Sequence, residues 1–298
     1  MIVTLGNKEY IFLIGYQWEN SYRKAFNDLA GKVFGLSFED WYQAGYWNEK
    51  YIPYTLCVGK QAVASVSVNI MDFNVLGQQK RYIQIGTVLT DAAYRNKGLS
   101  RFLMEYVLKE WGSQCDLIYL FANRTVLEMY PKFGFTPVKE YVYSKPIKKI
   151  LHQDAGFEKL NMDLHANRDL LYDYARNTKP FGQLSMSENA DLVMFYCTSF
   201  LKGNVYRIKA LGVIVVAMFN EGQLHLWDVF GKHEVELDQV INALASVEIK
   251  SVLLGFTPKD QTGYVVKELI SDDTLFVQQD KADLFLENKL MFPLLSHA

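Results

Sequence analysis

The hydrophobic periodicity of this chain changes abruptly between residues 86 and 101, and this change constrains the fold more than any other feature. Up to Thr90 the chain is rich in Ile and Val, which indicates a buried strand. Beyond it, apolar residues recur at helical spacing, at Leu99, Phe102, Leu103, Tyr106, Val107 and Trp111. A strand that leads through a short loop into an amphipathic helix predicts an α/β fold.

The loop between this strand and helix has the composition of an anion site. The first N–H groups of a helix lack partners within the helix, and the helix dipole adds positive potential there. Gly98 leaves room for a phosphate to approach the backbone, and Ser100 is small. Arg95, Lys97 and Arg101 supply positive charge. We therefore expect a pyrophosphate site here; the alternative is an ordinary turn whose Arg and Lys side chains are solvated.

The order of predicted elements in the first half of the chain recurs in the second half. In the first half we expect helices at 18–33, 39–46, 99–111 and 124–132, and strands at 54–58, 62–71, 81–90, 117–122 and 135–143. In the second half we expect helices at 165–176, 189–201 and 236–245, and strands at 205–209, 213–219, 224–230 and 250–255. This repetition predicts a duplicated fold with domains at 1–150 and 151–298, joined by a connection over 145–160.

Composition narrows the class of protein. The 298 residues are 50% hydrophobic, enough for packed cores, and the net charge of -2 gives no general attraction to nucleic acid or anionic lipid. No apolar run approaches the roughly 18–20 residues that span a bilayer, and the N-terminus does not resemble a secretion signal. Cys57, Cys115 and Cys197 are too widely spaced for a disulfide framework or metal knuckle. We expect a cytoplasmic protein without a metal, as a monomer or homodimer, with no nucleic-acid or membrane partner.

Two segments carry a resemblance to a known family. They read Val88-x-Thr90-x-Ala92-x-Tyr94-Arg95-Asn96-Lys97-Gly98-Leu99-Ser100 and Asn123-x-x-Val126-x-x-Met129-Tyr130-x-x-x-Gly134-Phe135. The first resembles the acetyl-CoA-binding motif of the GNAT superfamily of N-acetyltransferases, and the second resembles the segment that follows it in that family. Ala92 stands where the family often has Pro, and Ser100 where it has Gly or Ala. The resemblance is close over about residues 10–145; the rest is similar only in element order, as in tandem GNAT proteins with one degenerate copy.

The resemblance implies a fold, a donor and a set of site residues. The fold would be a mixed, splayed sheet flanked by helices, present as two GNAT-like domains in tandem, with acetyl-CoA in a V-shaped gap of the first. The residues implied to bind acetyl-CoA are Val88, Thr90, Arg95, Asn96, Lys97, Gly98, Leu99, Ser100, Arg101 and Asn123. Tyr130 matches the family's usual general acid. A phenol is protonated at neutral pH and can give its proton to the leaving thiolate. The alternatives are that Tyr130 merely packs its short helix and that Asn123 caps the helix after it.

The general base that must deprotonate the substrate ammonium is not evident from the sequence. Gln84 stands where some relatives keep a Glu, and Asp72, Asp91 and Glu19 are loose candidates. Some tandem relatives place their C-terminal carboxylate in the site, which here would be that of Ala298.

The implied function is transfer of an acetyl group from acetyl-CoA directly to a primary amine of a small molecule or peptide. The alternative is a non-catalytic acyl-CoA-binding sensor or structural module. His165 and Asp169 match the HxxxD motif of unrelated acyltransferases, but we expect them to form a pair on the protein surface.

The second half is expected not to bind CoA, because Glu234 and Glu236 at its corresponding helix start would repel a pyrophosphate. Aromatic residues are frequent before the first motif, and either a cleft for the acceptor amine or core packing explains them: Tyr16, Trp18, Tyr22, Trp41, Tyr42, Tyr46, Trp47, Tyr51 and Tyr54.

Overall fold

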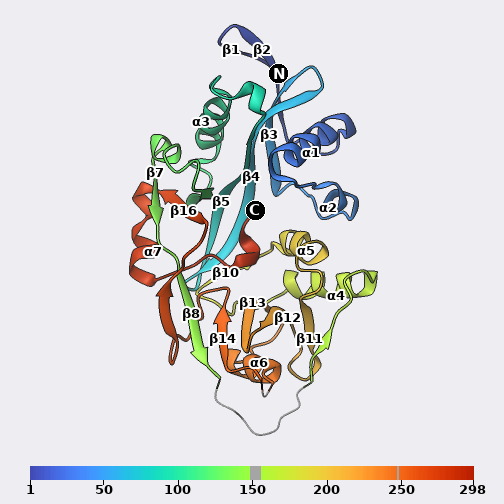
Figure 1. Ribbon diagram of the computed structural model, residues 1–298, viewed down its shortest axis with the longest axis vertical. Helices are drawn as coiled ribbons and strands as arrows, with labels where there is room; N and C mark the ends of the chain where they lie inside the picture. Colours follow the sequence, from blue (N-terminus) through green and yellow to red (C-terminus); the bar gives the residue numbers. More distant parts are fainter. Residues whose placement is uncertain (148–155, 247) are drawn as a thin grey trace.

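The computed structural model describes residues 1–147, 156–246 and 248–298, and these form two twisted sheets stacked end to end (Figure 1). The first sheet has the order β1 (Ile2–Leu5), β2 (Lys8–Ile14), β3 (Tyr51–Val58), β4 (Gln61–Val75), β5 (Gln78–Thr90), β6 (Leu117–Asn123), β16 (Asp273–Gln278) and β7 (Phe135–Val138), and β10 (Leu184–Ser187) pairs with β4. The second sheet has the order β15 (Val265–Glu268), β8 (Tyr141–Pro146), β14 (Ser251–Leu254), β13 (Gln223–Gly231), β12 (Val213–Asn220), β11 (Val205–Ile208) and β9 (Glu158–Lys159).

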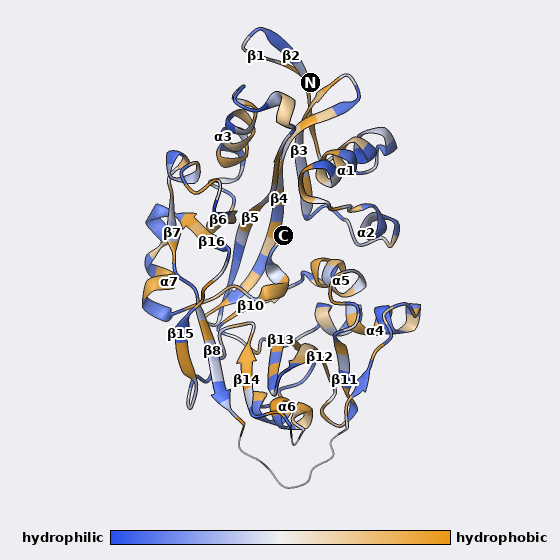
Figure 2. Ribbon diagram, viewed as in Figure 1, coloured by the Kyte–Doolittle hydropathy of each residue, from blue (hydrophilic) through white to orange (hydrophobic). Residues whose placement is uncertain are grey.

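Helices cover both sheets. They are α1 (Asn20–Phe34), α2 (Glu39–Gln43), α3 (Leu99–Trp111), α4 (His165–Arg176), α5 (Ala190–Thr198), α6 (Leu237–Leu244) and α7 (Asp283–Asn288). Helix α3 begins and ends as predicted and buries Leu99, Leu103, Met104 and Val107 against the first sheet. Figure 2 shows α1 and α3 alternating between hydrophobic and hydrophilic residues, as expected of helices with one face on a sheet.

The two halves of the chain exchange strands between the sheets, and β10 of the second half already pairs with β4 of the first sheet. Strand β8 belongs to the first half of the chain but pairs antiparallel with β14 and β15 of the second sheet. Strand β16 comes from the last part of the chain but lies between β6 and β7 of the first sheet, antiparallel to both. The predicted boundary between residues 150 and 151 falls in the segment 148–155, outside the described residues. Each sheet is thus completed by the other half of the chain.

One predicted helix is wrong. Residues 124–132 form turns followed by a single 3-10 turn at Tyr130–Phe133. The side-chain oxygen of Asn123 accepts a hydrogen bond from the backbone N–H of Thr125 at 3.0 Å, which sets a turn at the end of β6. Pro131 then removes a backbone donor that a continuing α-helix would need. The predicted extended segment 135–143 likewise divides between β7 and β8, which belong to different sheets.

Candidate active site

Strands β5 and β6 diverge in the middle of the first sheet. They pair in parallel over only four residues each, Tyr82–Ile85 of β5 with Leu117–Leu120 of β6. Beyond that point β5 bulges away from β4, because Ser67 pairs with Gly86 but Ser65 pairs with Leu89. Thr87 lies in this bulge with φ +48°, a conformation that is strained for a β-branched residue. The bulge and the divergence leave a gap in the sheet with unpaired strand edges facing it.

A cavity of about 670 Å³, here called the main cavity, occupies this gap. Its walls are the end of β5, the start of α3, the end of β6 and the turn before β7. Most of the residues predicted for acetyl-CoA and catalysis line it: Val88, Thr90, Arg95, Asn96, Gly98, Leu99, Ser100, Arg101, Asn123 and Tyr130. Lys97 does not; its Nζ donates to the Ala93 carbonyl at 2.8 Å and lies over the ring of Tyr94.

The start of α3 is open toward the main cavity. Gly98 is the N-cap in a left-handed conformation (φ +77°), and it offers no side chain to the first-turn amides. In the described ranges, the amides of Leu99, Ser100 and Arg101 have no backbone acceptor, and Arg95 and Arg101 form no ion pair. The helix start therefore has free donors and positive charge, the two requirements of an anion site.

Two side chains in this region are held by their own neighbours. The hydroxyl of Ser100 is 2.6 Å from that of Thr90, which fixes the helix start to the strand end. The side-chain oxygen of Asn123 accepts hydrogen bonds from the backbone N–H of Thr125 and from the Thr125 hydroxyl, the latter at 2.6 Å. Asn123 therefore lies at the rim of the main cavity as a turn residue.

Tyr130 reaches the main cavity from the 3-10 turn and is only 4% exposed. Its ring packs 5.6 Å from that of Phe276 and 6.5 Å from that of Phe135. Because Phe276 belongs to β16, the exchanged strand positions this tyrosine. Burial raises the pKa of the Tyr130 phenol to about 12, so the phenol keeps its proton at neutral pH.

The three loose candidates for the general base lie elsewhere. Asp72 is bound between the Nζ of Lys50 at 3.1 Å and the Nε of Arg81 at 3.0 Å. Glu19 is exposed ahead of α1. None of the described residues that line the main cavity is an Asp or Glu.

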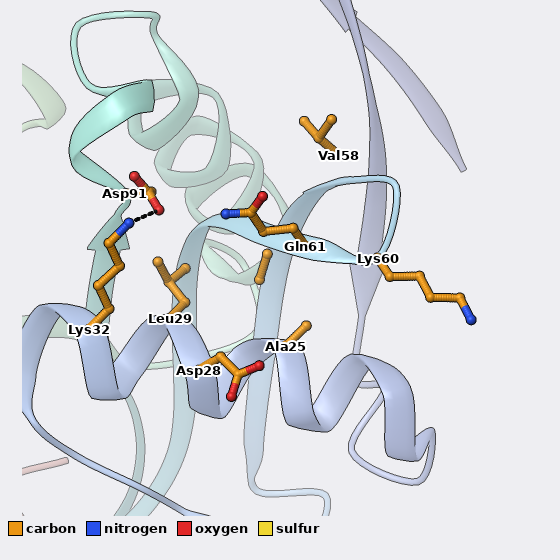
Figure 3. A pocket seen from close by; sticks show the side chains of 9 residues that line it. Ala25, Asp28, Leu29, Lys32, Val58, Lys60, Gln61 and Asp91 are labelled. Carbon is orange, nitrogen blue, oxygen red and sulfur yellow. Dashed lines mark hydrogen bonds and ion pairs between the residues drawn. The ribbon is translucent and has the colours of Figure 1, made fainter.

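Asp91 borders a separate hollow of about 470 Å³ between α1 and the turn from β3 to β4 (Figure 3). Its carboxylate pairs with the Nζ of Lys32 at 2.7 Å and accepts from the amide of Ala93 at 2.9 Å. The Lys32 ammonium, followed by the Ala93 amide, lowers the pKa of this carboxyl group. Asp91 therefore holds the turn before α3 in place.

Gln84 connects to the last residue of the sequence. Its Nε2 donates to the carbonyl oxygen of Ala298 at 3.2 Å, and its Oε1 accepts from the hydroxyl of Tyr119 at 3.3 Å. Gly86 leaves the space that Ala298 occupies, because a Cβ there would collide with the Ala298 carbonyl. Ala298 thus lines the main cavity beside the bulge of β5, and in Figure 1 the C-terminus lies next to β4 and β5.

The second half treats its corresponding helix start differently. Glu236 is the N-cap of α6 and forms a reciprocal capping box with Gln239. In this box the Glu236 carboxylate accepts from the backbone N–H of Gln239, which is a first-turn amide of α6. His165 and Asp169 form an exposed pair at 2.7 Å on α4.

Other kinds of site find no support in the described ranges. No cluster of His, Cys, Asp and Glu there is arranged to hold a metal ion. None of the helices described is long and apolar enough to cross a bilayer.

Comparison with known proteins agrees with this geometry. Residues 17–138 match the model of the acetyltransferase (GNAT) domain. No curated protein matches the sequence significantly.

Three solved structures share the fold over nearly the whole chain. A probable N-acyltransferase from Enterococcus faecalis is 14% identical with a TM-score of 0.57, covering 93% of this chain and 75% of its own. A GCN5-related N-acetyltransferase from Anabaena variabilis is 14% identical with a TM-score of 0.54, covering 93% and 75%. Another from Kribbella flavida is 15% identical with a TM-score of 0.51, covering 91% and 73%. The predicted fold, a tandem arrangement of mixed sheets, is confirmed.

Proposed function

Because residues 17–138 match the model of the GNAT acetyltransferase domain, we propose that the protein transfers an acetyl group from acetyl-CoA to a primary amine of a small molecule or peptide. One observation carries the proposal: the open start of α3, the unpaired edge of β5 and the buried phenol of Tyr130 all face one cavity. The amides of Leu99–Arg101 and the side chains of Arg95 and Arg101 suit the pyrophosphate. The edge of β5 at Val88 and Thr90 suits the amide-bearing arm of the donor.

The chemistry requires two proton transfers. The amine nitrogen attacks the thioester carbon, a C–N bond forms, and the C–S bond breaks. The phenol of Tyr130 gives its proton to the leaving sulfur, and the nitrogen loses a proton to an acceptor. Since burial raises the pKa of Tyr130 to about 12, kcat should not fall between pH 7 and 10 through loss of the donor proton.

Substitution of Tyr130 by Phe tests the proposal. We expect kcat to fall by roughly a hundredfold or more, because general-acid catalysis contributes about 10²–10⁴-fold. The dissociation constant of acetyl-CoA should stay unchanged. Tyr174→Phe, which removes a hydroxyl from the second half, should leave both constants unchanged. Tight acetyl-CoA binding with no turnover on any amine would instead support a non-catalytic acyl-CoA-binding module.

For the proton acceptor we propose the carboxylate of Ala298. A chain that ends at this residue places its α-carboxylate in the main cavity, where the neutral amide of Gln84 donates to it. A Glu at position 84 would repel that carboxylate, which gives a physical reason for the Gln.

The two versions of Ala298 to compare are the free acid and the C-terminal amide, which differ by one charge and not in length. Amidation should lower kcat by about a hundredfold, the scale of a lost general base. Acetyl-CoA binding should not change. A chain extended past Ala298 with unimpaired turnover would remove this residue from the mechanism.

A further inference from the structure

A second cavity of about 240 Å³, here called the aromatic cavity, adjoins the main cavity. Thr87 and Ala298 line both, so the two meet beside the bulge of β5. The other walls are the C-terminal end of α1, helix α2 and helix α5. Its aromatic lining residues are Phe34, Phe38, Trp41, Tyr51, Phe195, Tyr196, Phe200 and His297.

Both halves of the chain build these walls. Phe195 of α5 stacks on Phe38 with ring centroids 5.5 Å apart and an interplanar angle of 11°. Trp41 of α2 meets the same Phe195 edge-on at 5.5 Å, and its Nε1 donates to the Asp191 carbonyl at 2.8 Å. Of the aromatic residues that precede the first motif, Trp41 and Tyr51 line a cavity in addition to packing in the core, whereas others such as Trp47 and Tyr54 pack in the core.

The body of the aromatic cavity is uncharged. None of the described lining side chains belongs to Asp, Glu, Lys or Arg. The hydroxyl of Tyr51 already donates to Thr87 at 2.8 Å, and that of Tyr196 already donates to the His297 carbonyl. A ligand rich in hydroxyl or ammonium groups would leave several of them unpaired here, which opposes binding.

The carbonyl of Ala298 is a group that can receive an amine where the cavities meet. His297 also lines the aromatic cavity, but its Nε2 is fully covered by protein and does not face a ligand. Its ring stacks on Phe121 at 3.8 Å. The carbonyl end of Ala298 lies beside it. An amine held here would be next to the gap between β5 and β6, with its substituent among the aromatic rings.

The volume limits the size of the ligand. Pockets for drug-sized molecules span about 300–1,000 Å³, so a cavity of about 240 Å³ suits a smaller molecule. One aromatic ring on a short chain fits this description.

We propose that the aromatic cavity binds the acceptor and selects arylalkylamines, meaning primary amines with one aromatic ring on a short alkyl chain. This proposal rests on the proposed acetyltransferase function and names its substrate class. It also assigns a role to the second half of the chain, whose Phe195 and Phe200 complete the selecting wall.

The test compares 2-phenylethylamine with ethanolamine and putrescine, with acetyl-CoA held constant. We expect kcat/KM to be at least about tenfold higher for 2-phenylethylamine, since burial of one ring gives a preference of this order. Equal or better turnover of ethanolamine or putrescine would overturn the substrate class and leave the acetyltransferase function intact. Binding of 2-phenylethylamine measured by calorimetry, together with absent turnover, would support the cavity and overturn the function.

A substitution at the mouth of the aromatic cavity tests whether this cavity causes the preference for 2-phenylethylamine. Phe200 is 60% exposed, so Phe200→Ser should fold normally. We expect it to raise KM for 2-phenylethylamine about threefold to tenfold and to leave KM for acetyl-CoA unchanged. The matched control is Phe157→Ser, an exposed phenylalanine outside the aromatic cavity that packs on Phe219. Equal effects of the two substitutions on KM for the amine would overturn the assignment of the cavity.

Discussion

The two sheets contain the same kind of gap, and only the first one is open. In the second sheet β13 and β14 also pair in parallel over four residues, Gln223–Leu226 with Ser251–Leu254, and β13 also shifts register against β12 just beyond. There, however, the amide of Leu294 donates to the Gly255 carbonyl at 3.0 Å, immediately after β14. Leu295 is 1% exposed within the adjoining core. The final segment of the chain therefore occupies the second gap before its last residue reaches the first.

This difference shows that a gap in the sheet is not sufficient for the proposed donor site. The first gap has a helix start capped by Gly98, which leaves amides free, and a basic loop beside it. The second has a helix start closed by the carboxylate of Glu236 and a gap filled by Leu294. A single stretch, residues 293–298, thus closes one gap and completes the other.

Truncating the buried leucine of the segment that occupies the second gap should have the largest effect. Leu295→Ala should lower the free energy of unfolding by about 2–5 kcal/mol, the range for a buried leucine that leaves a cavity. Urea denaturation measures it. Leu286→Ala on α7, where the side chain is 55% exposed, should change stability by less than about 0.5 kcal/mol. Similar losses in the two variants would mean that the final segment does not fill a core.

The second-largest effect is expected when the start of α3 is given a negative charge like that at the start of α6. Arg101→Glu removes a cation from the first turn of α3 and adds an anion there, so we expect KM for acetyl-CoA to rise about tenfold to a hundredfold. The effect should weaken as salt is added. Lys109→Glu makes the same charge change in the last turn of the same helix. If both substitutions raised KM equally, general charge and not the helix start would govern donor binding.

Local patterns in the sequence predicted β3, β4, β5 and β6 of the first sheet and the helix start at Gly98, but not β1, β2 or β10. They did not predict the exchange of β8 and β16, because strand partners far apart in the chain leave no mark on periodicity. For the same reason the contact of Phe276 with Tyr130 was invisible. Two local signals argued against the predicted helix at 124–132. Asn123 can set a turn through its side chain, and Pro131 lacks the backbone N–H that a continuing helix needs. The placement of Ala298 beside Gly86 matched a hypothesis from family resemblance and had no local signal.

The stoichiometry of acetyl-CoA binding tests the central comparison most directly. Calorimetric titration of the full chain should give one equivalent of acetyl-CoA per chain, with the affinity reduced in Arg101→Glu. Two equivalents per chain, or one whose affinity Arg101→Glu leaves unchanged, would contradict the account of one open and one filled gap.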